Sequence, residues 1–258
     1  MKINSHNKTI LIFADPHQEL DRVREILSRE SPDIIVSLGD YFDSFNHDLL
    51  RDWENTCLFL KENVLKLNFF TLKGNHDIQY FYKNPSLICS GYDRDKDAFI
   101  NGFFSPTKWS AIKEKFLWYI WVDDFLCTHA GLHPSHLPPN QNISKKSISD
   151  WLDKQIEPAQ IALDSGQRHW LYGAGLARLG SQDKGGIDWL DFNQEFEPIS
   201  GLKQIVGHTP GDFVRSHRSE RGLELSKSKN LCIDSSLNEY LLIRNKKVLI
   251  KKFSDLWS

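Results

Sequence analysis

Carboxylate, amide and imidazole side chains recur directly after short apolar runs at five places in this chain. The residues concerned are Asp15 and His17, Asp40 and Asp43, Asn75 and His76, His129, and His208. Such oxygen and nitrogen ligands, with no thiolate among them, suit divalent cations such as Mn, Fe, Zn or Ni. They are too many for one ion, and a carboxylate such as that of Asp40 can bridge two. The set therefore predicts a pair of metal ions able to hold a phosphate ester, with a spare histidine to protonate the leaving oxygen.

The apolar runs before these residues predict the strands that must position them. The runs are Thr9–Ala14, Ile34–Val36, Asn68–Lys73, Phe125–Thr128 and Leu202–Val206. Apolar residues at helical spacing predict helices over 20–27 and 48–65, between the first three strands. Right-handed strand–helix–strand units bring the carboxyl ends of their parallel strands to one edge of a sheet. We therefore expect the polar residues to converge at that edge, with Gly39 letting the chain leave the second strand sharply.

The remainder of the chain has weaker patterns. We expect helices over 106–115 and 144–163, with Pro158 kinking or breaking the second. The runs Leu117–Val122 and Phe125–Thr128 predict an antiparallel hairpin, and the charged run Asp93–Asp97 is typical of a solvated turn. Residues 166–200 are rich in Gly, Trp, Asp and Arg and predict an irregular, cap-like insertion beside the site. The C-terminal part predicts three further strands.

Composition and charge limit the class of protein. The chain has 258 residues, a hydrophobic fraction of 40% and a formal net charge of −2, with acids and bases mixed along it. It therefore lacks the basic footprint of a dedicated nucleic-acid binder. The cysteines are scattered without CxxC spacing, which favours reduced thiols in a cytoplasmic protein: Cys57, Cys89, Cys127 and Cys232. The N-terminus has no signal-peptide pattern, and no apolar run is long enough to span a membrane.

Taken together, the five polar segments resemble a known family. They read Asp15-x-His17, Gly39-Asp40-x-x-Asp43, Gly74-Asn75-His76-Asp77, Thr128-His129-Ala-Gly and Gly207-His208. In this order they are similar to the five blocks of the calcineurin-like metallophosphoesterases, over about residues 9 to 243. The sequences around the blocks look most similar to the branch of Ser/Thr protein phosphatases and diadenosine tetraphosphate hydrolases. A single block is common as a cap or turn at a strand end, whereas five in family order are specific.

The resemblance implies a fold and a role for each of these residues. The implied ligands of the first metal ion are Asp15 and His17. The implied ligands of the second are Asn75, His129 and His208, and Asp40 would bridge the two ions. His76 would be the general acid for the leaving group, with Asp43 orienting its ring. The implied fold is an α/β sandwich of four layers, with two stacked mixed β-sheets flanked by helices, and we expect residues 1–258 to form one such domain.

Two positions depart from the family pattern. Pro210 stands where many phosphodiesterase branches carry a second histidine in the last block, and the protein-phosphatase branch shares that absence. Ser44 stands where the protein-phosphatase branch carries an arginine that grips the phosphate. If the substrate is a phosphoprotein, another cation must take this role, and the candidates in the cap-like segment are Arg178, Arg168 and Lys184. We rank Arg178 first because a planar guanidinium is the natural fork for phosphate.

Three functions follow as hypotheses. The first is a dinuclear phosphatase that hydrolyses phosphate monoesters by attack of metal-bound hydroxide. The second is hydrolysis of a dinucleotide polyphosphate or phosphodiester. The third is a non-catalytic binding scaffold, which is disfavoured because every block is intact. The expected partners are phosphoproteins, nucleotides or small phosphoesters, without a membrane. Histidines away from strand ends are expected to be ordinary polar residues: His6, His47, His169 and His217.

Overall fold

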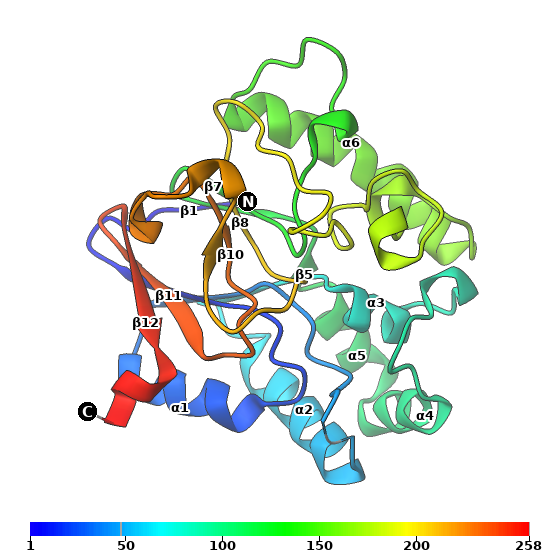
Figure 1. Cartoon of the computed structure of the whole chain (residues 1–258). Helices are drawn as coiled ribbons and strands as arrows, with labels where there is room; N and C mark the ends of the chain where they lie inside the picture. The colour runs from blue at the N-terminus through cyan, green and yellow to red at the C-terminus, as the bar shows by residue number, and fades with distance from the viewer. Residues whose placement is uncertain (47, 258) are drawn as a thin grey trace.

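Two mixed β-sheets of six strands each form the centre of the molecule (Figure 1). The computed structural model describes residues 1–46 and 48–257, so His47 lies outside the described residues. Helices cover the outer faces of the sheets. In Figure 1, α1 (Leu20–Glu30) and α2 (Leu50–Asn63) run along the lower side, and α6 (Lys145–Asp164) crosses the upper side. The predicted arrangement of two stacked mixed sheets flanked by helices is confirmed.

The sheet that carries the first three polar segments has the strand order β12-β11-β2-β3-β4-β5. Its parallel neighbours are β2 (Thr9–Phe13), β3 (Ile34–Ser37), β4 (Phe69–Leu72) and β5 (Phe116–Leu117). Two antiparallel strands extend it, β11 (Glu239–Arg244) and β12 (Lys247–Lys252). The parallel order follows because α1 joins β2 to β3 and α2 joins β3 to β4, as a crossover between parallel strands requires.

The second sheet has the strand order β1-β6-β7-β8-β10-β9. Its centre is the predicted hairpin of β6 (Ile120–Val122) and β7 (Phe125–Cys127), with β8 (Lys203–Val206) parallel to β7. Its remaining strands are β1 (Lys2–Ile3), β9 (Arg215–Ser216) and β10 (Asn230–Cys232). Because β7 and β8 are parallel, the fourth and fifth polar segments leave this sheet at the same end.

Shorter elements fill the space between the two sheets and the surface. Three helices follow β4 and lie together on the right of Figure 1: α3 (Asn75–Phe81), α4 (Arg94–Phe103) and α5 (Pro106–Lys113). The 3-10 turns are Pro85–Leu87, Pro134–His136, Trp170–Tyr172, Leu176–Arg178, Arg218–Glu220, Leu225–Lys227 and Phe253–Trp257. Between α6 and β8 the described residues are irregular or in 3-10 turns, apart from an isolated bridge between Gly175 and Gln182, in agreement with the irregular structure predicted for residues 166–200.

The central strand β2 shows why the first apolar run is continuous. Ile10 and Ile12 pack into the core between the two sheets. Leu11 and Phe13 point the other way, into the core that the sheet shares with α1 and α2. Side chains alternate between the two faces of a strand, so a strand covered on both faces needs apolar residues at every position. A slip of one residue would exchange the two sets, and the double burial therefore fixes the register that places Asp15.

The run Leu117–Val122 does not form one strand, contrary to the prediction. Its start belongs to β5, which pairs with β4 in the first sheet, whereas Ile120–Val122 pairs with β7 in the second. Trp118 and Tyr119, both buried, form the crossing between the two sheets. A continuous apolar run has the same pattern in either case, since both strands and the crossing lie in the core.

One local prediction was wrong, and the helix break predicted as one alternative at Pro158 does not occur. The charged run Asp93–Asp97 is the start of α4: the Asp93 carboxylate accepts the backbone N–H groups of Asp95 and Lys96, each at 2.8 Å, as a helix cap. Pro158 lies inside α6, which continues to Asp164. Tertiary packing outweighs the lost hydrogen bond there, because Leu152 and Ala159 are buried on either side of the proline.

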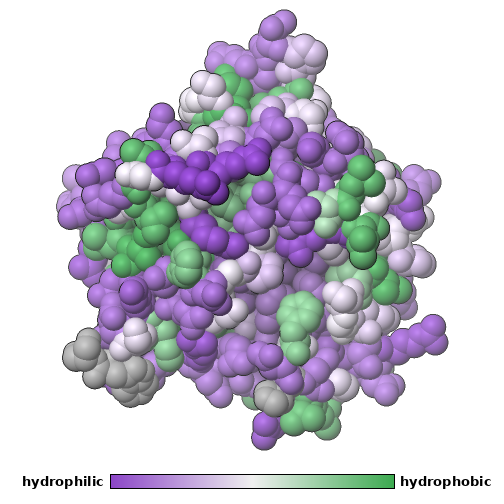
Figure 2. Space-filling view, viewed as in Figure 1, coloured by the Kyte–Doolittle hydropathy of each residue, from purple (hydrophilic) through white to green (hydrophobic). Residues whose placement is uncertain are grey.

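The face of the molecule seen in Figure 2 is mostly polar. Figure 2 shows a largely hydrophilic face on which hydrophobic side chains gather in several separate patches. Among the described residues, no helix combines the length and the apolar composition needed to cross a bilayer.

The core between the sheets should dominate stability. Leu241 of β11 is fully buried in it, so Leu241→Ala should lower the free energy of unfolding by about 2–5 kcal/mol through lost burial and a cavity. The matched control is Leu67→Ala, whose side chain is 93% exposed and which should change it by less than about 0.5 kcal/mol. Urea denaturation measures both. Equal effects of the two substitutions would contradict this assignment of the core.

Candidate active site

Five strands end at one edge of the facing sheets, and a predicted site segment follows each. β2, β3 and β4 of the first sheet lead into the segments of Asp15, Asp40 and Asn75. β7 and β8 of the second sheet lead into those of His129 and His208. The pairs β2–β3, β3–β4 and β7–β8 are parallel, so the carboxyl ends within each sheet point the same way. The site is therefore assembled where the two sheets meet.

Potential ligand atoms form two groups that share Asp40. One group contains Asp15, His17 and Asp40, and the other contains Asp40, His129 and His208. Within each group the ligand atoms lie within 4.8 Å of one another. His17 is partly exposed, and the other members are buried. This division corresponds to the two ligand sets that the family resemblance implies, with the carboxylate of Asp40 between them.

Backbone carbonyl groups orient two of the histidines. The Nδ1 of His17 lies 2.8 Å from the carbonyl oxygen of Asp43, and the Nδ1 of His129 lies 2.7 Å from that of Leu38. A carbonyl oxygen only accepts, so each Nδ1 carries a hydrogen, and in the neutral ring Nε2 is the nitrogen with the lone pair. The Nε2 of His129 lies 3.2 Å from Asp40 Oδ2 and 3.2 Å from Asn75 Oδ1. Asn75 thus joins the second group.

The donor set fits divalent cations. Asp15 Oδ1 and His208 Nε2 are buried and have no hydrogen-bond partner among the described residues. Burial and the neighbouring Asp234 raise the pKa of Asp15 well above its ordinary value. Burial and the nearby His129 lower the pKa of His208 well below its ordinary value. Buried polar atoms are normally paired, and a divalent metal ion accepts both a carboxylate oxygen and an imidazole nitrogen.

His76 and Asp43 form a buried pair beside the two ligand groups. The Nδ1 of His76 lies 2.9 Å from Asp43 Oδ2, and the backbone N–H of His76 donates to Asp40 Oδ1 at 2.9 Å. Burial alone would lower the pKa of His76, but the charge of Asp40 and the hydrogen bond to Asp43 outweigh it and raise this pKa well above its ordinary value. With Nδ1 bonded to a carboxylate, Nε2 is the ring position left to exchange a proton with a bound group.

The backbone at the strand ends is bent into the left-handed region. The φ angles are 48° at Asp15, 40° at His17, 59° at Asp40, 64° at Asp43 and 65° at His208. This conformation is unfavourable for residues other than glycine, and it persists where surrounding contacts enforce it, typically at functional sites. The bends turn the chain back, so that consecutive polar residues point toward the same centre.

One of the enforcing contacts comes from Asp77. Its carboxylate accepts the backbone N–H groups of Asp40 and Tyr41, each at 2.8 Å, and that of Gly74 at 3.2 Å. Asp77 therefore joins the segment after β3 to the segment after β4. The sequence showed Asp77 within the third block, but its role as a link depends on contacts that only the folded chain makes.

The family is settled by comparison. Residues 8–212 match the family model of the calcineurin-like phosphoesterases, which is more than half of the chain. The chain belongs to this family. It is therefore a phosphoesterase, a hydrolase of phosphate esters.

Solved structures share the fold of this phosphoesterase. The cold-active protein-tyrosine phosphatase of a psychrophilic Shewanella species has 16% sequence identity and a TM-score of 0.58, covering 98% of this chain and 80% of that chain. A protein serine/threonine phosphatase from Saccharomyces cerevisiae has 14% identity and a TM-score of 0.54, covering 98% of this chain and 83% of that chain. At these identities the likeness concerns the fold alone. The curated proteins contain no match.

Glycines let the second and third blocks of the phosphoesterase touch. A Cβ on Gly74 would lie 2.0 Å from Asp40 Oδ1, and one on Gly39 would lie 2.6 Å from the backbone nitrogen of Gly74. Gly39 also has a φ of 100°, which side chains rarely tolerate. Only glycine therefore allows the two strand ends to come this close.

Of the three predicted phosphate-binding cations, the structure places Arg178 beside a predicted ligand. Its Nε lies 2.9 Å from Asp191 Oδ2, and its Nη2 lies 3.4 Å from the carbonyl oxygen of His208. Arg168 is exposed and lines a separate cavity. Lys184 lies near His133. The pKa of His133 is lowered by burial and, to a smaller extent, by the positive charge of Lys184. The phosphate-binding role of Arg178 stays a prediction.

Two aromatic rings flank the site in positions that the sequence did not reveal. Phe45 is 66% exposed, and its ring centroid lies 5.0 Å from that of His17 and 5.6 Å from that of His76. On the other side, the ring of Trp189 lies 5.3 Å from that of His208. The one available signal for Phe45 was its place directly after Ser44, where the chain departs from the family pattern.

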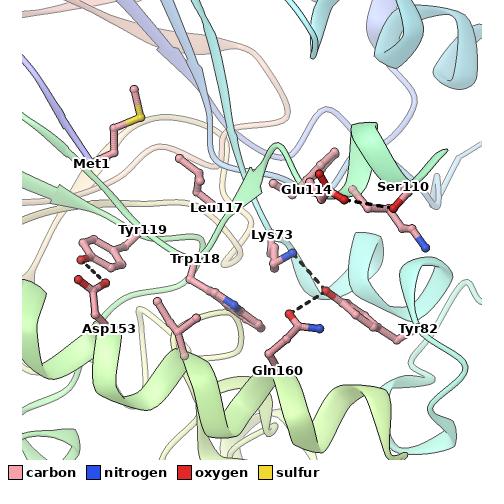
Figure 3. Close-up of a pocket in the computed structure, with 13 residues that line it drawn as sticks. Met1, Lys73, Tyr82, Ser110, Glu114, Leu117, Trp118, Tyr119, Asp153 and Gln160 are labelled. Atoms are coloured by element: carbon pink, nitrogen blue, oxygen red, sulfur yellow. Dashed lines mark hydrogen bonds between the residues drawn. The ribbon is translucent and has the colours of Figure 1, made fainter. Parts of the chain in front are cut away.

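A separate cavity of about 510 Å³ lies between β5, α5 and α6 (Figure 3). Figure 3 shows Lys73 directed at the hydroxyl of Tyr82, which in turn donates to Gln160 of α6. Tyr119 donates to Asp153 at 2.7 Å on the opposite wall. None of the predicted metal ligands lines this cavity, so it is distinct from the site at the strand ends.

Gly74→Ala should abolish tight metal binding, because the new methyl group would displace the Asp40 carboxylate that both ligand groups share. Isothermal titration with Mn²⁺ measures the affinity, with at least about a tenfold loss expected when a supporting contact of a ligand is lost. The matched control is Gly102→Ala in α4, where a Cβ meets no atom within 4 Å. Unchanged Mn²⁺ affinity in Gly74→Ala would show that the ligands bind from another arrangement.

Proposed function

We propose that this phosphoesterase hydrolyses phosphate monoesters at a centre of two divalent metal ions, with Mn, Fe, Zn or Ni as candidates. The observation that carries the proposal is the pair of ligand groups that share the buried carboxylate of Asp40. A bridging carboxylate between two sets of nitrogen and oxygen ligands is the arrangement that holds two ions about 3.5–4 Å apart. Further support comes from the unpaired atoms of Asp15 and His208, one in each group.

The chain would supply ligands from both sheets. Asp15 and His17 would hold one ion, Asn75, His129 and His208 the other, and Asp40 both. When bound, such ions supply an activated water and neutralise charge on the phosphate. The protein keeps the ligand nitrogens available, because the carbonyl groups of Asp43 and Leu38 fix the hydrogens of His17 and His129 on Nδ1.

His76 would act as the general acid that protonates the leaving group. Its Nδ1 is bonded to Asp43, so Nε2 can give a proton to the ester oxygen as the P–O bond breaks. The edge contact between the rings of His76 and His17, whose centroids are 5.1 Å apart, supports a role for His76 beside the first ligand group. A histidine backed by a carboxylate suits this work near neutral pH.

Arg178 would bind the phosphate from the segment 166–200, which we propose as a cap on a single domain. Its contact with the backbone of His208 supports this position, and Nη atoms not engaged by Asp191 can form a fork with two phosphate oxygens. The two structural neighbours are protein phosphatases, which favours phosphorylated proteins or other monoesters as substrates. Four free cysteines support a reducing, cytoplasmic compartment.

The proposal is tested by the hydrolysis of p-nitrophenyl phosphate and of its bis-ester with added Mn²⁺. We expect the monoester to be preferred, chelation to stop turnover, and Asp40→Asn to lower kcat by at least about a thousandfold, since Asp40 belongs to both ligand groups. Asp150→Asn, an exposed residue on α6, is the matched control. Preference for the bis-ester would favour the phosphodiester hypothesis, and near-normal activity of Asp40→Asn would refute the shared site.

Arg178→Ala should raise KM for p-nitrophenyl phosphate by about ten- to a hundredfold, because a charge-assisted contact to the substrate contributes about 1.5–3 kcal/mol. The control is Arg168→Ala, which removes an exposed arginine of the same segment that lines another cavity. Steady-state kinetics on the Mn²⁺-loaded protein measures both. If Arg168→Ala raises KM and Arg178→Ala does not, the phosphate binds on the other side of the cap.

A further inference from the structure

Lys96 of α4 is a fully buried lysine next to the Asp43–His76 pair. Its Nζ lies 2.5 Å from Asp43 Oδ1, 2.6 Å from Asp48 Oδ2 and 3.2 Å from the carbonyl oxygen of Gly91. An ammonium group has three hydrogens, and here each has an acceptor. No hydrogen is left for a substrate, so Lys96 does not replace the arginine that is missing at Ser44.

The carboxylate of Asp43 receives four donors. Oδ2 accepts from His76 Nδ1 and from the amide of Gln79, and Oδ1 accepts from the hydroxyl of Tyr80 and from Lys96, each at 2.5 Å. These contacts use the full acceptor capacity of a carboxylate. Asp43 is completely buried, and a buried carboxylate is costly without a paired cation. Lys96 is the donor of this set that carries a permanent charge.

Lys96 also has a second carboxylate partner. Besides Asp43 it contacts Asp48, which lies directly before α2. Asp48 is held further by the side chains of Gln18 at 3.0 Å and Trp53 at 2.6 Å. A single buried ammonium therefore joins Asp43 and Asp48 to α4.

We propose that Lys96 is a positioning residue for the reaction: by fixing the carboxylate of Asp43 it holds the ring of His76 in the orientation from which Nε2 protonates the leaving group. The inference rests on the proposed function, in which His76 is the general acid. It differs from a purely structural role because it predicts a selective effect. Loss of Lys96 should lower kcat/KM for substrates whose leaving group needs a proton. It should leave kcat/KM unchanged for substrates whose leaving group needs none.

The test compares phenyl phosphate, whose phenolate needs a proton, with 2,4-dinitrophenyl phosphate, whose leaving group departs without one. Lys96→Met alone would leave the buried carboxylate of Asp43 and the partly exposed carboxylate of Asp48 without their shared cation. The informative variant is therefore Lys96→Met combined with Asp48→Asn, and its control is Asp48→Asn, which retains the contact between Lys96 and Asp43. The two proteins then differ only in the lysine. Thermal melting establishes that both are folded.

We expect the ratio of kcat/KM for the dinitrophenyl ester over the phenyl ester to rise at least about tenfold in the double variant relative to the control, within the range that general acid catalysis contributes. A second readout is the ¹H–¹⁵N NMR signal of the His76 Nδ1–H in the metal-free protein, which should shift or broaden in the double variant and stay in place in the control. Equal loss on both esters together with an unmoved signal would overturn the proposal.

Asp43→Asn separates this inference from the function on which it rests. If Asp43→Asn raises the ratio and the double variant does not, Lys96 holds α4 in place without positioning the acid, and the proposed function stands. If Asp43→Asn itself leaves the ratio unchanged, the roles of His76 and Asp43 in the proposed function fail. Removal of Asp43 after Lys96 should add little, since residues that act through one another are not additive.

Discussion

The structure of the site depends on one buried charge, the carboxylate of Asp40. Burial alone would raise its pKa, but the imidazoles of His129 and His76 outweigh that effect and lower it. Oδ1 accepts the backbone N–H of His76, and Oδ2 lies 3.2 Å from His129 Nε2. Because a buried anion must be compensated on every side, the loops after β3, β4 and β7 are drawn together around it.

The two sheets make this compensation possible. Each sheet alone would place its polar segments at the end of its own strands, in contact with solvent. Face to face, they bring carboxylates from the first sheet and imidazoles of His129 and His208 from the second into one buried centre. Apolar residues between the sheets, among them Ile12 and Leu241, set the distance. The left-handed turns at the strand ends then aim the side chains inward.

Two positively charged side chains near the site, Arg178 and Lys96, differ in how deeply they are buried. Arg178 is partly exposed beside His208 and can reach a bound phosphate. Lys96 is fully buried behind Asp43 and is saturated by protein acceptors. Lys96 is thus enclosed by protein, whereas Arg178 is accessible for the phosphate contact that we propose. In this proposal the arginine missing at Ser44 is replaced by Arg178, and Lys96 balances the charge of Asp43.

The family resemblance, the parallel strands of the first sheet and the polar residues at their ends could be predicted from the sequence, because polar residues that follow apolar runs obey local periodicity and the crossover rule. Other features of the fold could be recognised only in the tertiary structure. The division of Leu117–Val122 between two sheets, the continuous α6 across Pro158 and the burial of Lys96 within a charged run all depend on what packs against the segment. Periodicity indicates which positions are buried, but it does not indicate which segment packs against them. A charged residue is expected to be exposed from sequence alone, and only the folded structure shows that Lys96 is paired with Asp43 in the interior.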